Sequence, residues 1–340
     1  MKRYLLILLY LGIVLLGVTS CEYEELCYNH SEHALRYNIN VIADYRCDWE
    51  EKCDDGPDWK TQWPNSYVDY DALRPKSPTG LRVVVYNDNG ENITHNINAE
   101  GGVVSLYNGY NDMLFYNNDT EYIVFTSMGA TTRATTRTRT RSTYQGNTYA
   151  NEGEPTLAPP DMLYANFFAD HLAEKVQDPI DYEVTLQPLV FTYKIRYEFA
   201  EGLEYVSLAR GVLSGMASSV TLNTGQTSDE SASILYDCEV TDYGVRAFVN
   251  SFGIPSYPNP NYSTTRADNK HALNLEVLLR NGKTMVFEFD ITDQVKAQPH
   301  GGVIVVDNIV IPKEDGQQGS GAFDVEVDDW GDYEDVVLPL

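Results

Sequence analysis

The sequence predicts an all-β protein made of two tandem antiparallel β-sandwich domains, and three observations support this fold class. Tyrosine is abundant, with 25 residues against 11 phenylalanines, and aromatic and β-branched residues prefer strands. Apolar and polar residues alternate over many short segments, as they do in half-buried strands. Asn-Gly pairs interrupt these segments and supply the positive φ angles of tight hairpin turns. Short strands at close spacing are typical of a sandwich or a barrel.

Residues 1–20 have the layout of a secretory signal peptide. Two basic residues open the chain, and a run of Leu, Ile and Val continues to Gly17. This run is shorter than the roughly 20 apolar residues that a membrane-spanning helix needs. Thr19 and Ser20 place small side chains just before Cys21, which resembles a bacterial lipobox. We therefore expect the mature chain to begin at an acylated Cys21.

An acylated Cys21 predicts a protein tethered to membrane lipid. Each methylene of an acyl chain such as palmitate contributes about 0.8 kcal/mol of membrane affinity. The acidic residues Glu22, Glu24 and Glu25 resemble the export signal of some lipoproteins that reach the outer face of an outer membrane. We expect a lipid-anchored protein at the cell surface. The alternative is an unmodified cysteine near an ordinary cleavage site.

The net charge of the chain limits the classes of partner that it can bind. The formal net charge is -26 and the isoelectric point is near 4.4. An acidic surface repels phosphate backbones, so we expect no nucleic-acid partner.

The length of 340 residues suggests two domains of about 150 residues each. Pro188 interrupts two strand patterns, so the boundary is expected near Gln187. The predicted domains are residues 21–187 and 188–340.

Four cysteines remain after Cys21, and an exported compartment permits disulfides between them. Cys47 and Cys53 are close enough in sequence to close a small loop, and unpaired buried thiols are the alternative. Cys27, His30 and His33 have the spacing of zinc ligands, but a structural site needs four ligands. We expect no metal and interpret this segment as a tether or turn.

An acidic segment rich in tryptophan follows the first predicted strand. In the segment 44–64, Trp49, Trp59 and Trp63 lie among the six carboxylates of residues 48–58. Exposed tryptophans beside carboxylates can bind sugars or calcium, which makes this segment a candidate ligand-contact loop. The alternative is a loop whose aromatic side chains pack over the end of a sandwich. The residue pattern of a helix-loop-helix calcium site is absent.

The first half of the chain has a regular series of strand patterns. We expect strands at residues 36–43, 81–86, 93–97, 103–106, 112–116 and 120–125. The second and third form a hairpin around Asn87-Asp88-Asn89-Gly90. Residues 131–143, TTRATTRTRTRST, are predicted to be an exposed mobile loop, with proteolytic processing after arginine as an alternative. Residues 167–176 are predicted to form a short helix.

The second half of the chain has a similar series of strand patterns. We expect strands at residues 182–187, 190–199, 205–216, 220–223, 234–240, 244–249, 273–279, 284–291, 303–306, 309–311 and 321–330. Asn281-Gly282 turns the hairpin between residues 273 and 291. Residues 292–295 are predicted to form one helical turn.

Two groups of motifs resemble a known family. Phe115–Ile123, FYNNDTEYI, follows the lipobox-like segment in the first half. In the second half, Ser214–Met216, the hairpin that runs into Phe289–Val295, and the terminal Gly321–Trp330 continue the similarity. Together they resemble the fimbrillin-like lipoproteins of Gram-negative anaerobes, which include accessory and anchor subunits of type V pili. The motifs are turns, caps and a packing tryptophan, and they carry no functional residue of the family.

The resemblance implies transthyretin-like sandwiches and a role in anchoring or assembling a pilus, with a contribution to adhesion. The implied partners are pilus subunits, which would add a strand to an open sandwich edge.

Motifs of common enzyme classes are absent. The chain contains no Gly-X-Ser-X-Gly, no His-Glu-X-X-His, no glycine-rich phosphate loop and no dinucleotide fingerprint. We therefore expect no enzymatic activity and no cofactor. Two alternative functions are a surface glycan-binding lipoprotein that uses the three tryptophans, and a structural lipoprotein unrelated to a pilus.

Overall fold

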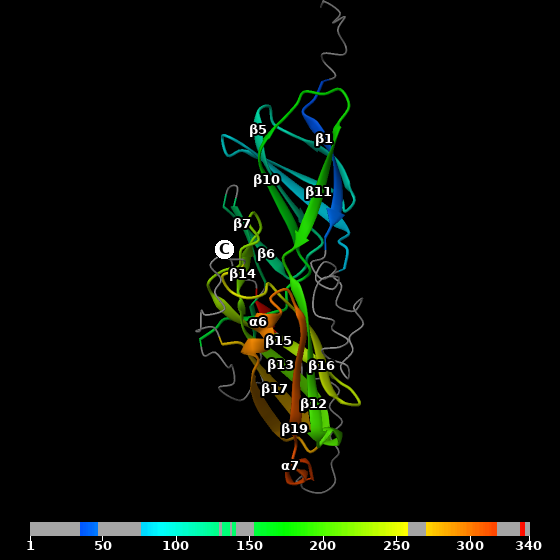
Figure 1. The fold of residues 1–340 in the computed structure, drawn as a ribbon, viewed down its shortest axis with the longest axis vertical. Helices are drawn as coiled ribbons and strands as arrows, with labels where there is room; N and C mark the ends of the chain where they lie inside the picture. The colour runs from blue at the N-terminus through cyan, green and yellow to red at the C-terminus, as the bar shows by residue number, and fades with distance from the viewer. Residues whose placement is uncertain are drawn as a thin grey trace, which may run out of the picture.

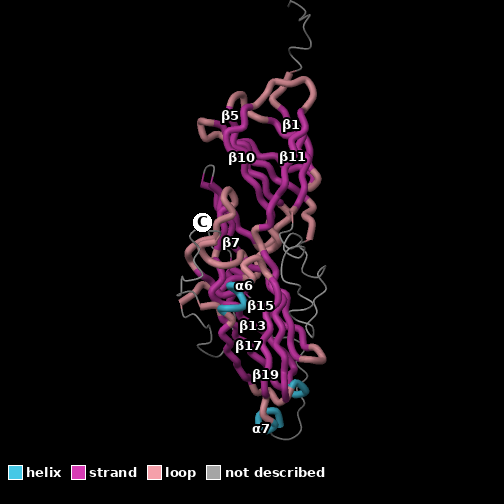
Figure 2. Tube along the Cα trace, viewed as in Figure 1, coloured by secondary structure: helices cyan, strands magenta, loops and turns pink. Residues whose placement is uncertain are grey.

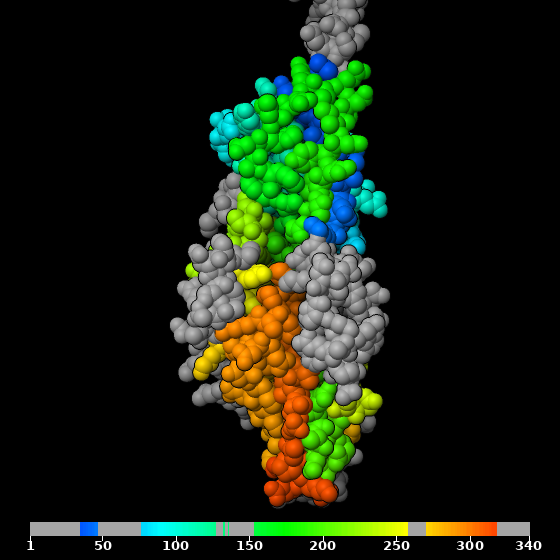
Figure 3. Space-filling model, in the orientation of Figure 1, coloured from blue at the N-terminus to red at the C-terminus, as the bar shows by residue number. Residues whose placement is uncertain are grey.

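The strands of the protein form two bodies that follow one another along the long axis (Figure 1). The structure is a computed structural model, and it describes residues 35–46, 76–128, 131–136, 138–140, 153–257, 270–317 and 334–336. Strands dominate the described residues (Figure 2), so the predicted all-β class is confirmed. In the space-filling view the two bodies adjoin and form one elongated molecule (Figure 3).

The first body, the barrel, is a closed sheet. Its strands in spatial order are β1 (Asn38–Tyr45), β11 (Ile180–Pro188), β10 (Tyr164–Leu172), β5 (Tyr110–Asn117), β2 (Gly80–Asn87), β3 (Asn92–Asn98) and β4 (Gly101–Ser105). β1 closes it by pairing in parallel with β11 and antiparallel with β4. The predicted hairpin of β2 and β3 is confirmed, and Gly90 has a φ of 78° in its turn.

The second body, the sandwich body, has one long path of paired strands. Their order is β18 (Thr284–Asp290), β17 (Ala272–Leu279), β13 (Val206–Ala217), β15 (Ser231–Val240), β16 (Gly244–Ser251), β12 (Phe191–Glu201) and β19 (Gly302–Val310). β15 and β16 share only two residue pairs. Residues from both ends of the path, such as Leu275 and Ile304, contribute to one core. The sheet therefore encloses its core between two layers.

Several short elements complete the described fold. β9 (Thr156–Leu157) pairs with β15, β8 (Thr138–Thr140) pairs with β9, and β20 (Glu334–Val336) pairs with β8. β6 (Ile123–Met128), β7 (Thr131–Thr136) and β14 (Ser219–Thr221) form a separate sheet. The helical elements are η1 (Leu203–Tyr205), α6 (Thr292–Ala297) and α7 (Lys313–Gln317). α6 begins where the helical turn was predicted.

A hydrophobic cluster between the two bodies joins them. Val84 and Leu114 point outward from the barrel and pack with Leu189, Val220 and Phe252 from later parts of the chain. The inner face of the same strands fills the barrel with a separate cluster. β2 is therefore buried on both faces, which explains its unbroken Val-Val-Val-Tyr run.

Two predictions from the sequence are wrong. Residues 164–172 form the strand β10 rather than a helix, because they pair with β5 across a bulge at which Asp170 has a φ of 55°. Residues 131–136 and 138–140 of the Arg/Thr-rich tract form β7 and β8 rather than a loop. β-Branched threonines are frequent there, and β7 pairs on both sides, with β6 and with β14. The strands expected at 303–306 and 309–311 are a single strand, β19.

Some predictions concern residues that the structure does not describe. The strand expected at 321–330 lies outside the described residues, and the domain boundary near Gln187 stays a prediction. β9 and β7, which precede this boundary, pair with β15 and β14, which follow it. Of the helices in the described ranges, none is both long and apolar enough to cross a membrane.

Candidate functional site

The candidate site is the junction between the barrel and the sandwich body. The chain leaves β5 at Asn117 and turns through Asn118-Asp119-Thr120 toward β6. This turn belongs to the FYNNDTEYI motif on which the family resemblance depends. It lies beside residues 76–80, which lead into β2, and residues 160–164, which lead into β10.

Asn117 is the centre of the junction because its buried side chain contacts three parts of the chain. Its Nδ2 donates to Asp119 Oδ1 at 2.7 Å and to the Met162 carbonyl at 3.0 Å. Its Oδ1 accepts the backbone N–H of Tyr164 at 2.7 Å. The side chain is 2% exposed, so these bonds form away from water. Asn117 thereby fixes the entry of β10 against the end of β5.

Asp119 connects the same turn to the start of β2. Its Oδ2 accepts the backbone N–H of Thr79 at 2.7 Å and the Thr79 hydroxyl at 3.1 Å. Partial burial alone would raise the pKa of Asp119, but the hydrogen bonds from Asn117 and Thr79 outweigh it and hold the pKa below its usual value. Asp119 is therefore an ionised structural acceptor.

Asp161 performs a related role on the other side of the turn. Its Oδ2 accepts the backbone N–H groups of Glu121 and Tyr122 at 2.7 and 2.5 Å. Asn250 of β16 reaches the same segment, since its Nδ2 donates to the Pro160 carbonyl at 3.0 Å. Its Oδ1 accepts the Thr192 hydroxyl of β12 at 2.8 Å. A continuous set of hydrogen bonds thus connects the sandwich body to the barrel.

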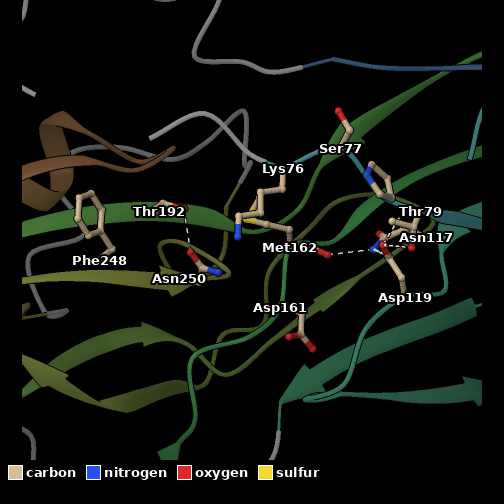
Figure 4. Close-up of a pocket in the computed structure, with 11 residues that line it drawn as sticks. Lys76, Ser77, Thr79, Asn117, Asp119, Asp161, Met162, Thr192, Phe248 and Asn250 are labelled. Carbon is tan, nitrogen blue, oxygen red and sulfur yellow. Dashed lines mark hydrogen bonds between the residues drawn. The ribbon is translucent and has the colours of Figure 1, made fainter. Parts of the chain in front are cut away.

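These groups border a pocket of about 500 Å³. Figure 4 shows Phe248 on one side of it and Asn117 and Asp119 on the other, with Lys76, Met162 and Asp161 between. The remaining lining residues are Ser77, Pro78, Thr79, Thr192 and Asn250. The volume lies within the range of about 300–1,000 Å³ that is usual for small-molecule sites.

A group of basic residues lies next to the pocket on the face of β12 and β16. Lys194 pairs across the strands with Phe248, and Arg196 pairs with Arg246. The Lys194 ammonium lies over the Phe248 ring, 5.7 Å from its centroid, and the Arg196 guanidinium lies 3.8 Å from the centroid of Tyr243. Burial lowers the pKa of Lys194, and the positive charges of Arg196 and Arg246 lower it further.

The two carboxylates that line the pocket are both held by donors from the chain. Backbone N–H groups donate to Asp161, whereas the Asn117 amide and the N–H and hydroxyl of Thr79 donate to Asp119. The described residues contain no cluster of three metal-ligating side chains.

The site residues predicted from the sequence are not among those that the structure describes. Cys21, Cys47, Cys53 and the three tryptophans Trp49, Trp59 and Trp63 are outside the described residues, so their predicted roles stay predictions. The sequence analysis missed Asp161, Phe248 and Asn250, which come together only through the pairing of distant strands. The FYNNDTEYI motif does mark the junction in the sequence, although its residues there hold the backbone in place.

The comparisons with known proteins agree with this architecture. A family model described as a domain of unknown function, DUF5119, matches residues 65–237. Fim4B of Bacteroides ovatus, which is named as a proposed fimbrium anchoring subunit, is 23% identical over 302 residues, which cover 80% of this chain and 88% of Fim4B. A crystal structure of a proposed adhesin from Bacteroides ovatus has a TM-score of 0.53 at 18% identity, covering 84% of this chain and 97% of the adhesin. The fimbrial anchor protein Mfa2 from Porphyromonas gingivalis aligns with a TM-score of 0.38 at 14% identity, over 79% of this chain and 90% of Mfa2.

The fold and the junction define an elongated all-β protein whose two bodies are joined by a hydrogen-bonded turn and a hydrophobic cluster. The chain belongs to the DUF5119 family. The resemblance to fimbrillin-like fimbrial subunits that the motifs predict is confirmed.

Proposed function

We propose that the protein is a lipid-anchored subunit of the cell surface that anchors a fimbrium or serves as an accessory subunit in its assembly. The observation that carries this proposal is the similarity to Fim4B, which extends over most of both chains. The relatives reported above are named as fimbrial and adhesin proteins, in line with a structural role that includes adhesion and no enzymatic activity. In the same proposal the two bodies are tandem transthyretin-like domains, residues 21–187 and 188–340.

The shape of the molecule supports a tether at one end. β1 begins at the end of the barrel that lies away from the sandwich body, whereas α7 lies at the opposite end of the long axis (Figure 1). At this barrel end the backbone of Arg36 exchanges two hydrogen bonds of 2.8 Å with Val176. Residues 22–34, which span at most about 50 Å when extended, connect Cys21 to this point. An acylated Cys21 would hold the barrel near the outer membrane and let the sandwich body project.

The projecting body has a strand that can accept a partner. Within the described residues β18 pairs only with β17, through seven successive residue pairs without a shift. β19, the other end of the path, pairs with β12 through a register that shifts twice, and such irregularities disfavour strand addition. We therefore choose β18 as the edge to which a neighbouring pilus subunit adds a strand.

The hydrogen-bond alternation along β18 supports this choice. Ile291 N–H donates to the His271 carbonyl, and Leu279 N–H donates to the Lys283 carbonyl, at 2.9 and 2.8 Å. In an antiparallel register this places the backbone groups of Met285, Phe287 and Phe289 toward β17. The N–H groups of Val286 and Glu288 then point to the open side.

Deletion of the gene in its own organism tests the proposed function. We expect electron micrographs to show fewer filaments attached to the cells, with filaments released into the medium, because the base of the fimbrium is lost. Complementation with the intact gene should restore attachment. An unchanged number of attached filaments in the deletion strain would contradict the anchor role.

A further inference from the structure

The junction pocket contains a carboxyl group whose one oxygen is held in place and whose other oxygen has no donor among the described residues. Two backbone N–H groups fix Oδ2 of Asp161, while Oδ1 accepts no hydrogen bond from the described residues. The side chain is only partly exposed and lines the pocket. Because the fixed oxygen removes the freedom of the carboxylate to rotate, Oδ1 is a preorganised acceptor for a ligand hydroxyl.

An aromatic ring stands at the side of the same pocket. Phe248 is 46% exposed, although it lies in the middle of the central pairing between β16 and β12. The Lys194 ammonium over the ring restricts its position. A large apolar ring that is held rigidly and left open to solvent beside a polar pocket is a surface on which a flat, partly apolar ligand can stack.

Two further polar groups face the ligand space. Lys76 and Ser77 line the pocket and are exposed, and no hydrogen bond or ion pair of their side chains occurs within the described residues. In Figure 4 the Lys76 side chain extends between the Phe248 side and the Asn117 side. The pocket therefore offers a charged acceptor, a charged donor, a hydroxyl and an aromatic face.

From these observations we propose that the junction pocket binds a saccharide. A pyranose ring presents C–H groups on one face, which pack against an aromatic ring, and hydroxyls around its rim, which both donate and accept. Phe248 takes the apolar face, Asp161 accepts from a hydroxyl, and Lys76 donates to another. A phosphate-bearing ligand is disfavoured because Asp161 and Asp119 place two carboxyl groups in the same pocket. A purely apolar ligand would leave these groups without partners.

This proposal does not depend on the fimbrial role. It also differs from glycan binding by Trp49, Trp59 and Trp63, because none of its residues belongs to that segment.

Saturation-transfer difference NMR with the full mature chain tests the proposal. The probes are the methyl glycosides of galactose, glucose, mannose, N-acetylglucosamine and fucose, together with sialyllactose. We expect saturation transfer to the ring protons of at least one probe, followed by a measurable affinity in isothermal titration. A panel in which no probe receives saturation overturns the proposal.

Two substitutions locate the binding. Asp161→Asn keeps an oxygen that can accept the two backbone N–H groups but replaces the free oxygen with a donor, so the affinity should fall about tenfold or more. Phe248→Ala removes the stacking surface and should weaken binding to a similar degree, whereas Phe248→Trp should retain it. Thermal unfolding of each variant verifies that the fold is intact.

Two controls complete the design. Tyr110→Ala removes an aromatic ring that is 51% exposed at the far end of the barrel, and it should leave the affinity unchanged. A triple Trp49→Ala, Trp59→Ala, Trp63→Ala variant should also retain binding. Saccharide binding that survives both pocket substitutions, or that is lost only in the tryptophan variant, overturns the proposal.

Discussion

At the scale of single residues, a buried amide rather than a hydrophobic contact sets the geometry of the junction. The Asn117 side chain accepts one hydrogen bond from the backbone of β10 and donates two others. No apolar side chain of similar volume can therefore replace it. An apolar substitute would leave the Tyr164 N–H and the Met162 carbonyl without partners in a buried place.

Substitution of Asn117 by alanine tests this role. We expect Asn117→Ala to lower the free energy of unfolding by about 2–4 kcal/mol, because several buried polar groups lose their partners together. Chemical denaturation of the purified mature chain measures the change. The neighbouring Asn118→Ala is a matched control, since Asn118 Nδ2 makes a single bond of 3.0 Å with Asn96, and it should cost about 1 kcal/mol or less. Equal effects of the two substitutions would contradict a special role for Asn117.

His271 makes the sandwich body sensitive to acid. The ring is fully buried, and neither nitrogen has a hydrogen-bond partner in the part of the chain that the structure describes. Burial and, to a smaller extent, the positive charge of Lys296 lower the pKa of His271 to about 4, while the negative charge of Asp290 opposes the shift. The unfolded chain therefore binds a proton at a higher pH, near 6.5, than the folded chain does.

The stability contributed by a neutral His271 is thus complete above about pH 6.5 and is lost as the pH falls toward 4, by up to about 3 kcal/mol. Unfolding by urea at several pH values measures this loss. His271→Leu should show a smaller loss over the same window, because the variant has no proton to bind there. A pH profile identical to that of the unmodified protein would contradict the assignment to His271.

The local residues of the junction could be predicted from the sequence, but the partners of those residues could not. The FYNNDTEYI motif indicates a turn, and the turn exists at Asn117-Asn118-Asp119. Asp161 lies about 40 residues away in sequence, and its contact with Glu121 depends on the way β10 returns to β5. No local pattern carries such information.

At the scale of elements, alternation identified most strands because one face of each strand meets a core. It failed at β10, where Phe167 packs outside the barrel and Phe168 inside it, so that the apolar residues are adjacent and imitate part of a helix. It failed again at β7, where a polar tract becomes a strand through its partners β6 and β14. Tertiary pairing outweighed local composition in both places.

A proline in β18 tests whether this strand is the docking edge. In the register derived above the N–H of Val286 points away from β17, so Val286→Pro removes a donor from the open side and keeps the ladder with β17. We expect the variant to be folded but to recover fewer fimbrial subunits when it is purified from membranes. Val286→Thr, which keeps the N–H, is the control. Undiminished recovery with Val286→Pro would exclude β18 as the edge.

At the scale of the whole molecule, the two bodies and the cluster between them form a rod-like unit with different ends. The barrel end receives the chain from the N-terminal side (Figure 1), and the sandwich body carries β18, which pairs only with β17 within the described residues. The Val84, Leu114, Leu189, Val220 and Phe252 cluster resists bending at the joint, because separating the bodies would expose these side chains to water. A pull on a filament bound to β18 would therefore reach the tether through packed strands.

Removal of the tether should release this unit without unfolding it. Cys21 precedes the first described strand, and no described strand depends on it, so Cys21→Ala should leave the thermal unfolding of the mature body unchanged. The acyl chains would be lost with the thiol, and with them about 0.8 kcal/mol of membrane affinity for each buried methylene. We expect the variant to move from the membrane pellet to the soluble fraction and to lose incorporation of labelled palmitate. Cys238→Ala, in β15, removes a different thiol and should remain in the pellet. If Cys21→Ala stays with the membranes and remains labelled, the lipid is attached elsewhere in the chain. The proposal that a tether at the barrel end leaves the sandwich body to accept pilus subunits would then lack its physical basis.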